Sequence, residues 1–301
     1  MRFHGQTIGS TGKANILIIS IFDFCTGMRK KESTYFRNKV VLITGSSRGI
    51  GKTLAWQLGK MGARVVLNGR TPDRLKVLEE EMRLEQVEVK GVLADVTVPD
   101  DCERMIREVL DHYGRIDILV NMAGLSMKGE AADLHPDVYR MTMETNYLGA
   151  VYPTLAALPH IRVSKGSILF ISSVSALMGF SQFSAYCASK MSLTALAESL
   201  RLEMTDTGVY IGIIYISFTE NEEGKTILDT RSRLVRKKEV YVGKMDYVSR
   251  EKVARSIIRQ LARRRYRVNP SFYGKFLSFM KRFFPRLSFS ILHMARRKGI
   301  I

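Results

Sequence analysis

Short apolar runs alternate with longer amphipathic segments along most of this chain, from residue 39 to residue 217. The apolar runs are rich in Val and Ile and predict buried strands at 39–44, 63–69, 87–96, 116–124, 166–172 and 209–217. Between them, apolar residues recur three and four positions apart, which predicts helices over 49–62, 72–82, 100–114, 135–158 and 183–204. Pro72 and Pro99 mark the entry of two of these helices.

Strands that are apolar throughout and separated by helices are typical of a parallel sheet covered on both faces. We therefore predict an α/β fold, a Rossmann-type doubly wound parallel sheet with helices on both faces. We divide the chain into an N-terminal extension (1–37), a main domain (38–269) and a C-terminal segment (270–301). Residues 217–248 are polar and irregular, and we expect a mobile segment over the site that the sheet makes.

The N-terminal extension contains an apolar stretch at residues 14–25. It includes Asp23 and is too short to span a membrane, which takes about 20 apolar residues. With Arg2 and Lys13 in front, it would also suit the core of a signal peptide. We favour a third interpretation, in which translation begins at Met28 and residues 1–27 are not part of the native protein.

Charge is distributed unevenly. The net charge is +18, but residues 252–301 hold 14 Lys or Arg and no acid, which leaves 33 basic and 29 acidic residues before them. This argues against a uniformly basic nucleic-acid-binding domain and for a local surface that attracts anions. The three cysteines, Cys25, Cys102 and Cys187, follow no metal or redox spacing and indicate a reducing compartment, and we expect no metal site.

The first strand runs directly into the sequence TGSSRGIG, at residues 44–51. Glycines let the chain turn tightly off a strand and approach a pyrophosphate, and the next helix N-terminus supplies N–H groups. The predicted cofactor contacts in this turn are Gly45, Ser47, Arg48, Gly49, Ile50 and Gly51.

The second predicted strand ends in Asn68-Gly69-Arg70 without an acid. An acid here would bind the adenosine ribose hydroxyls and repel a 2′-phosphate. Because Arg48 and Arg70 can instead pair with that phosphate, we predict NADP(H) as the cofactor.

Several motifs follow in a recognisable order: TGSSRGIG, Ala94-Asp95-Val96, NMAG at 121–124, Asn146, Ser173 in ISSVSAL, and Tyr186 with Lys190 in YCASK. In this order and spacing the chain resembles the short-chain dehydrogenase/reductase family over roughly residues 38–265. The resemblance implies hydride transfer between a nicotinamide and a carbonyl carbon. It also implies catalytic roles for Asn146, Ser173, Tyr186 and Lys190, and we expect a homo-oligomer.

Tyr186 and Lys190 stand four apart on a predicted helix and therefore share a face. A phenol has a pKa near 10, and a neighbouring ammonium lowers it toward neutral pH, as a general acid or base requires. In the family, the serine at position 173 binds the carbonyl oxygen and the lysine at position 190 also holds the nicotinamide ribose. The asparagine at position 146 anchors a water there.

The resemblance carries further cofactor contacts to this chain: Asp95, Val96, Asn121, Ala123, Gly124, Tyr186, Lys190 and Thr219. Asp95 would meet the adenine, while Thr44 is expected to be structural. The chain departs from the family pattern at two places. Met122 replaces an asparagine, and Ser217-Phe218 replaces a Pro-Gly before Thr219. Phe218 would then either line the substrate pocket or pack on the sheet.

The C-terminal segment places Phe272, Phe276, Phe279 and Phe283 at helical spacing, with Lys275, Lys281 and Arg282 between them. A basic amphipathic helix of this kind is typical of a segment lying on an anionic membrane. The alternative is a helix packed on the protein itself or on a second subunit; nucleic-acid binding lacks a supporting motif.

We predict an NADPH-dependent carbonyl reductase, or alcohol dehydrogenase, of the short-chain type. Its substrate would be an apolar or lipid-like ketone such as a 3-keto sphingoid or a steroid-like compound. The enzyme would be cytoplasmic and peripheral at a membrane. The alternative hypothesis is a protein that binds NADP(H) at a membrane surface as a sensor or scaffold without turnover.

Overall fold

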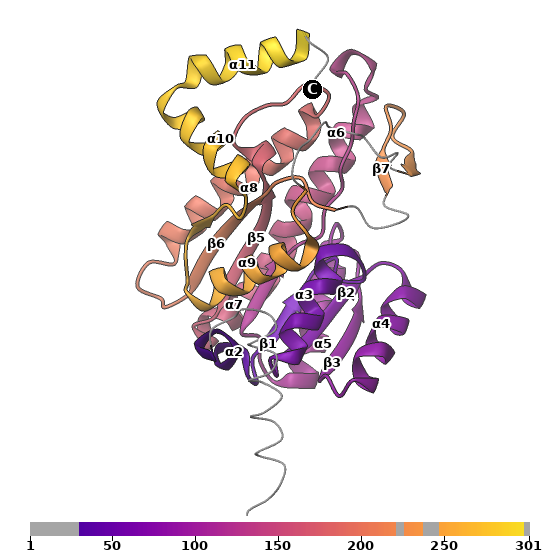
Figure 1. Ribbon diagram of the computed structural model, residues 1–301. Coiled ribbons are helices and arrows are strands. Elements are labelled where there is room, and N and C mark those ends of the chain that lie inside the picture. The colour runs from indigo at the N-terminus through magenta and orange to yellow at the C-terminus, as the bar shows by residue number, and fades with distance from the viewer. Residues whose placement is uncertain (1–29, 221–225, 237–246, 298–301) are drawn as a thin grey trace, which may run out of the picture.

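The computed structural model describes residues 30–220, 226–236 and 247–297, so the predictions for residues 1–29 lie outside it. Its centre is a seven-stranded sheet in the order β3-β2-β1-β4-β5-β6-β9, with every neighbouring pair parallel (Figure 1). The strands are β1 (Val40–Ile43), β2 (Arg64–Gly69), β3 (Val89–Leu93), β4 (Ile118–Asn121), β5 (Ser167–Ser173), β6 (Tyr210–Ile216) and β9 (Arg267–Val268).

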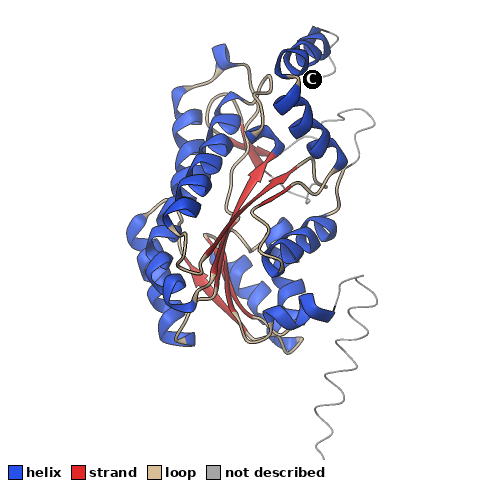
Figure 2. Ribbon diagram, turned by 90° about the vertical axis from the view of Figure 1, so that its left-hand side faces the viewer, coloured by secondary structure: helices blue, strands red, loops and turns tan. Residues whose placement is uncertain are grey.

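Two helical layers cover the sheet, and Figure 2 shows the strands between them. Within β1, Val41 and Ile43 enter the core on one face, and Val40 and Leu42 enter the core on the other. The first face is covered by α3 (Gly49–Lys60), α4 (Pro72–Leu84) and α9 (Arg250–Ala262), and the second by α5 (Pro99–Tyr113), α7 (Gly149–Ser164) and α8 (Ser184–Glu203). The predicted fold class is confirmed.

The strand order changes direction at β1, which lies between β2 and β4. In open parallel sheets, ligands bind outside the carboxyl ends of the strands at such a switch point. The turn after β1, the end of β4 and the end of β5 therefore face a common site.

The long helical region predicted over 135–158 is divided. Helix α6 (Pro136–Met143) passes into a π-helical turn, Glu144–Leu148, before α7 begins. A π turn inserts an extra residue into a helix and is frequent at functional sites. Here it contains Asn146, which is buried.

Helix α2 (Lys30–Phe36) precedes the boundary that we set at residue 38. The Phe36 side chain is fully buried in the core beneath α9, and the buried Glu32 carboxylate lies 2.5 Å from Arg263 and 3.5 Å from Arg259. The folded domain therefore includes at least part of the segment before residue 38.

Two features lie beside the sheet. Within 217–248, strands β7 (Thr226–Leu228) and β8 (Leu234–Arg236) form an antiparallel pair, while 221–225 and 237–246 lie outside the described residues. The C-terminal segment forms α10 (Phe272–Phe283) and α11 (Pro285–Arg297), at the top of Figure 1. Within the described ranges, none of the helices has the length and hydrophobicity that crossing a membrane requires.

Candidate active site

The turn between β1 and α3 is built around close backbone contacts. Gly45 has a left-handed φ of +63°, and a Cβ there would lie 2.8 Å from Ala123 Cα. A Cβ on Gly51 would lie 2.7 Å from both Gly45 O and Ser46 Cα. Arg48 is the N-cap of α3 and makes no side-chain capping hydrogen bond. The first N–H groups of α3 thus lack a capping side chain, as a helix N-terminus that receives a phosphate requires.

The turn is held by Thr44 and by a residue that sequence analysis passed over. Thr44 Oγ1 accepts from Met122 N at 3.0 Å and from Ala123 N at 3.1 Å, which confirms its structural role. The buried Asn68 side chain accepts from Gly45 N at 3.3 Å and donates to Ala94 O at 3.1 Å. Asn68 therefore ties the turn to β2 and β3. The sequence signal for this role was its position at the end of a strand, where family members can carry an acid that binds the cofactor.

The end of β2 carries several charged side chains. Arg48 and Arg70 are both exposed, and Arg70 Nη1 lies 3.4 Å from Asp95 Oδ2. Burial raises the pKa of Asp95, but hydrogen bonds from Thr97 and the charge of Arg70 outweigh it and leave the pKa below its usual value. Asp95, predicted to meet the adenine, and Arg70, predicted to pair with the 2′-phosphate, thus contact each other.

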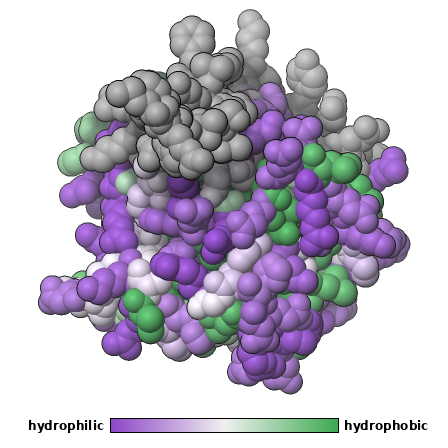
Figure 3. Space-filling model, turned by 90° about the horizontal axis from the view of Figure 1, so that it is seen from below, coloured by the Kyte–Doolittle hydropathy of each residue, from purple (hydrophilic) through white to green (hydrophobic). Residues whose placement is uncertain are grey.

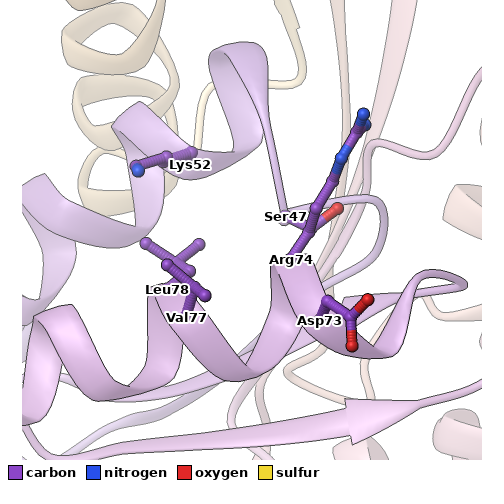
Figure 4. Close-up of a pocket in the computed structure, with 6 residues that line it drawn as sticks. All are labelled: Ser47, Lys52, Asp73, Arg74, Val77 and Leu78. Carbon is purple, nitrogen blue, oxygen red and sulfur yellow. The ribbon is translucent and has the colours of Figure 1, made fainter.

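A cavity of about 250 Å³ lies between α3 and α4, below the turn (Figure 4). Its lining combines Ser47 with five residues that sequence analysis did not name as site residues: Lys52, Asp73, Arg74, Val77 and Leu78. Arg74 follows Arg70 by four residues at the start of α4, and this spacing was the signal for a further cation.

The residues predicted to contact the cofactor after β3 and β4 differ in their exposure. The Asn121 amide is buried and donates to Thr154 Oγ1 at 2.9 Å, toward α7. Val96 is also buried, and a Cβ on Gly149 would lie 2.9 Å from its Cγ2. Gly124 is exposed, and a Cβ there would lie 3.3 Å from Asn146 Oδ1 and 3.5 Å from Lys190 Nζ. Of these three, Gly124 lies next to the predicted catalytic residues.

The four predicted catalytic residues come together from three elements. Ser173 ends β5, Tyr186 and Lys190 lie on α8, and Asn146 lies in the π turn. The Ser173 hydroxyl is close enough to Tyr186 to lower its pKa, and Lys190 Nζ donates to Ile171 O at 3.0 Å. The Asn146 amide donates at 2.9 Å to Leu125 O and to Ser189 Oγ, and its Oδ1 accepts from Leu125 N at 2.6 Å.

Comparison with known proteins gives the same assignment as the motifs. A family model described as short chain dehydrogenase matches residues 39–231, more than half of the chain. This chain belongs to the short-chain dehydrogenase/reductase family. It is therefore an oxidoreductase that uses a nicotinamide dinucleotide.

Relatives within the family are similar over most of the chain. The 11-beta-hydroxysteroid dehydrogenase 1A of Arabidopsis thaliana is 37% identical over 243 residues, 78% of this chain and 69% of that protein. A Caenorhabditis elegans short-chain dehydrogenase/reductase of unknown function, solved with cofactor, is 31% identical with a TM-score of 0.58 over 62% of this chain and 72% of that one. The Thermococcus sibiricus alcohol dehydrogenase complexed with 5-hydroxy-NADP has a TM-score of 0.68 at 24% identity, over 77% and 96% of the two chains, and shows the fold.

The titration of the site differs from our expectation for this short-chain dehydrogenase. We expected Lys190 to lower the pKa of Tyr186. Instead, burial raises the pKa of Tyr186, and the hydrogen bond with Ser173 offsets this only in part. Burial also lowers the pKa of Lys190 to about 8. The expectation was wrong in direction because removing a phenolate from water costs more than its neighbours return.

A phenol with a raised pKa stays protonated at neutral pH and can therefore donate a proton to an oxygen beside it. The Ser173 hydroxyl lies beside the Tyr186 side chain and can donate a hydrogen bond to the same oxygen. Lys190, with a pKa of about 8, can take up and release a proton near neutral pH. This combination is suited to protonating a carbonyl oxygen.

Thr219 lies at the far side of the site, where the chain departs from the family pattern. Its hydroxyl donates to Ser217 O at 3.1 Å, and its backbone forms a parallel bridge with Val248. Phe218 is half-buried, and its ring centre lies 6.5 Å from that of Tyr247.

Apolar residues flank Tyr186 on one side. Its ring packs against a cluster from α6, the loop after β4, the start of α8 and β7: Met127, Leu134, Val138, Ala185 and Leu228. A second cluster forms just beyond Ser173, where Val174 and Met178 contact Leu277 of α10. Two apolar clusters therefore lie beside the predicted catalytic residues.

Proposed function

We propose that this protein is an NADP(H)-dependent carbonyl reductase acting on an apolar, lipid-like ketone, with the reverse oxidation of the alcohol also open to it. The observation that supports this most directly is the meeting of Ser173, Tyr186, Lys190 and Asn146 at the carboxyl end of the sheet. The nicotinamide supplies the hydride to the carbonyl carbon when it is bound. The protein's own groups handle the oxygen and its proton.

In the reduction, the Ser173 hydroxyl holds the carbonyl oxygen and Tyr186 donates its phenolic proton to it. Lys190 then returns a proton toward Tyr186, which its pKa of about 8 allows near neutral pH. Asn146 hydrogen-bonds Leu125 and Ser189, and so fixes the residue that precedes Lys190 on α8.

The glycine turn fits a dinucleotide pyrophosphate, because Gly45 and Gly51 leave no room for a Cβ and so keep the turn tight at the N-terminus of α3. A preference for the 2′-phosphate is supported by Arg48 and Arg70, with Arg74 as a third cation at this end. On binding, the phosphate would compete with Asp95 for the Arg70 guanidinium. Solved structures with this fold include proteins complexed with NADP.

The substrate class is supported by the apolar clusters beside Tyr186 and Ser173. Relatives named 11-beta-hydroxysteroid dehydrogenase act, by name, on steroids. A steroid-like ketone or a 3-keto sphingoid remains our proposal for this chain. We also propose a homo-oligomer that works in the cytoplasm at the surface of a membrane.

The test is turnover by the purified full-length protein, followed as NADPH oxidation with a panel of steroid, long-chain and small water-soluble ketones. We expect activity with NADPH well above that with NADH, and a loss of at least about a hundredfold in Tyr186→Phe, since general acid catalysis contributes about 10²–10⁴. Full activity in Tyr186→Phe would refute the assigned chemistry. Cofactor binding without turnover on the whole panel would favour the sensor or scaffold instead.

A further inference from the structure

Helices α10 and α11 have an inner face that reaches the active site. Leu277 and Met280 of α10 are buried, and Leu277 packs with Val174 and Met178. Leu292 of α11 joins the same cluster. Val174 follows Ser173 directly in the chain. The C-terminal helices therefore support the backbone that carries the predicted oxygen-binding serine.

A second contact joins α11 to the loop after β4. Arg296 Nη2 lies 2.5 Å from Glu130 Oε1, which also accepts from Gln182 Nε2 at 2.9 Å. Gln182 adopts a left-handed φ of +66° and stands four residues before Tyr186. The helix pair thus contacts the loop between β5 and α8 through Val174 and Met178, and reaches Gln182 of the same loop through Glu130.

The outer face of the same helices is apolar and aromatic. In the described part of the chain, every exposed phenylalanine among the large exposed hydrophobic residues lies on or between these two helices. Together with three aliphatic residues they are Phe272, Phe276, Phe279, Phe283, Phe284, Leu287, Phe289, Ile291 and Met294, with exposed fractions from 46% to 84%. The opposite end of the molecule, seen from below, is mostly hydrophilic where it is drawn in colour, with scattered apolar residues (Figure 3). An exposed aromatic surface of this size marks a binding site.

The charges beside this surface identify its partner. Lys275, Lys281, Arg282, Arg286 and Arg297 are all exposed on the two helices, and the chain has no acid after Glu251. Phenylalanines bordered by Lys and Arg suit an anionic lipid surface, where the rings enter the acyl boundary and the cations meet the headgroups. A two-fold contact between two copies would instead place like charges against each other.

We propose that α10 and α11 dock the enzyme on an anionic lipid bilayer and hold the mouth of the active site at its surface, so that the ketone enters from the lipid. This rests on the proposed function for the nature of the substrate, but the docking surface itself does not. The inner face packs on the segment after Ser173 and so joins that segment to the docked helices.

The experiment compares two double variants of the full chain. Phe279→Ser with Phe283→Ser removes two outer-face rings that stand 4.9 Å apart and are 52% and 58% exposed. The matched control, Leu84→Ser with Leu202→Ser, removes two side chains that are 86% and 77% exposed on α4 and α8. Binding is measured by co-sedimentation with vesicles of phosphatidylcholine alone or mixed equally with phosphatidylglycerol, at low and high salt.

We expect the wild type and the control to bind the anionic vesicles, with binding weakened by salt and by omission of phosphatidylglycerol. The phenylalanine variant should bind at least about tenfold more weakly, as expected for the loss of two inserted rings. It should reduce a long-chain ketone embedded in vesicles more slowly, while its rate on a small water-soluble ketone and its melting temperature stay unchanged.

Equal vesicle binding by the wild type and the phenylalanine variant would overturn the proposal. So would a change of oligomeric state in that variant by light scattering without a change in vesicle binding, which would assign the face to a second copy. Absence of turnover on every ketone would contradict the proposed function alone, because the vesicle arm needs no substrate. If the double variant fails to fold, Lys281→Glu with Arg282→Glu tests the same surface through its charge.

Discussion

Replacing Lys190 by methionine should make the protein inactive and, near neutral pH, more stable. Lys190 is 5% exposed, and burial lowers its pKa from the ordinary 10.5 to about 8. At pH 7 the ammonium is charged in both the folded and the unfolded chain, so folding carries the full cost of burying it. This lowering of the Lys190 pKa corresponds to a destabilisation of the folded state by about 3 kcal/mol, at 1.36 kcal/mol per pKa unit.

The sign of the pH dependence follows from proton binding. Between pH 8 and pH 10.5 the unfolded chain keeps the Lys190 proton while the folded chain has lost it, so the free energy of unfolding rises with pH in this window. From pH 7 to pH 9.5 the wild type should gain about 2 kcal/mol from this residue. Methionine removes this gain, but it also removes the hydrogen bond to Ile171 O, which contributes about 1 kcal/mol at every pH.

The assay is urea unfolding of the wild type and Lys190→Met at pH 7, 8 and 9.5 without added nucleotide. We expect the variant to be more stable at pH 7 and the advantage to shrink by about 2 kcal/mol at pH 9.5. Lys76→Met, at an exposed lysine on α4, controls for the loss of one cation. A difference between wild type and variant that does not change with pH would refute the argument that burial sets the pKa of Lys190.

Three further predictions test other parts of the structure. Gly51→Ala should weaken NADPH binding at least about tenfold in a fluorescence titration, since its Cβ would lie 2.7 Å from two backbone atoms, whereas Gly179→Ala, which meets nothing within 4 Å, should bind normally. Arg70→Gln should lower the ratio of kcat/KM for NADPH over NADH by about 10–100-fold, the loss of one charge-assisted hydrogen bond, and an unchanged ratio would exclude its contact with the 2′-phosphate. Phe36→Ala should cost about 3–5 kcal/mol in urea unfolding because its ring is fully buried, and a cost below about 1 kcal/mol would show that α2 is not part of the domain.

Much of the fold could be predicted because its signals are local. The apolar runs that became β1 to β6 needed only the alternation of strands and helices, and the glycine turn needed only its place between a strand and a helix. The division at Asn146 could not be predicted, because the residues of the π turn have ordinary helical sequence. Its position depends on bonds to Leu125 and Ser189, which are distant in the chain.

At the cofactor end, too, the contacts of individual residues could not be predicted from the sequence. Arg70 was expected to face a phosphate, and the structure pairs it with Asp95, 25 residues away. Asn121 was expected in the cofactor channel, and its buried amide donates to Thr154, 33 residues away. In both cases the residue type was informative, but the partner was set by which strands and helices become neighbours.

The doubly wound sheet, the phosphate turn and the helical spacing of Tyr186 and Lys190 all follow from local sequence, because each depends on residues close together in the chain. The directions in which the pKa values of these two groups shift follow from packing, since their burial comes from elements far apart in sequence. Packing also divided the C-terminal segment into an inner face against Val174 and an outer face of phenylalanines. Helical periodicity predicts that an amphipathic helix has an apolar stripe, but only packing decides how much of it remains exposed to a partner.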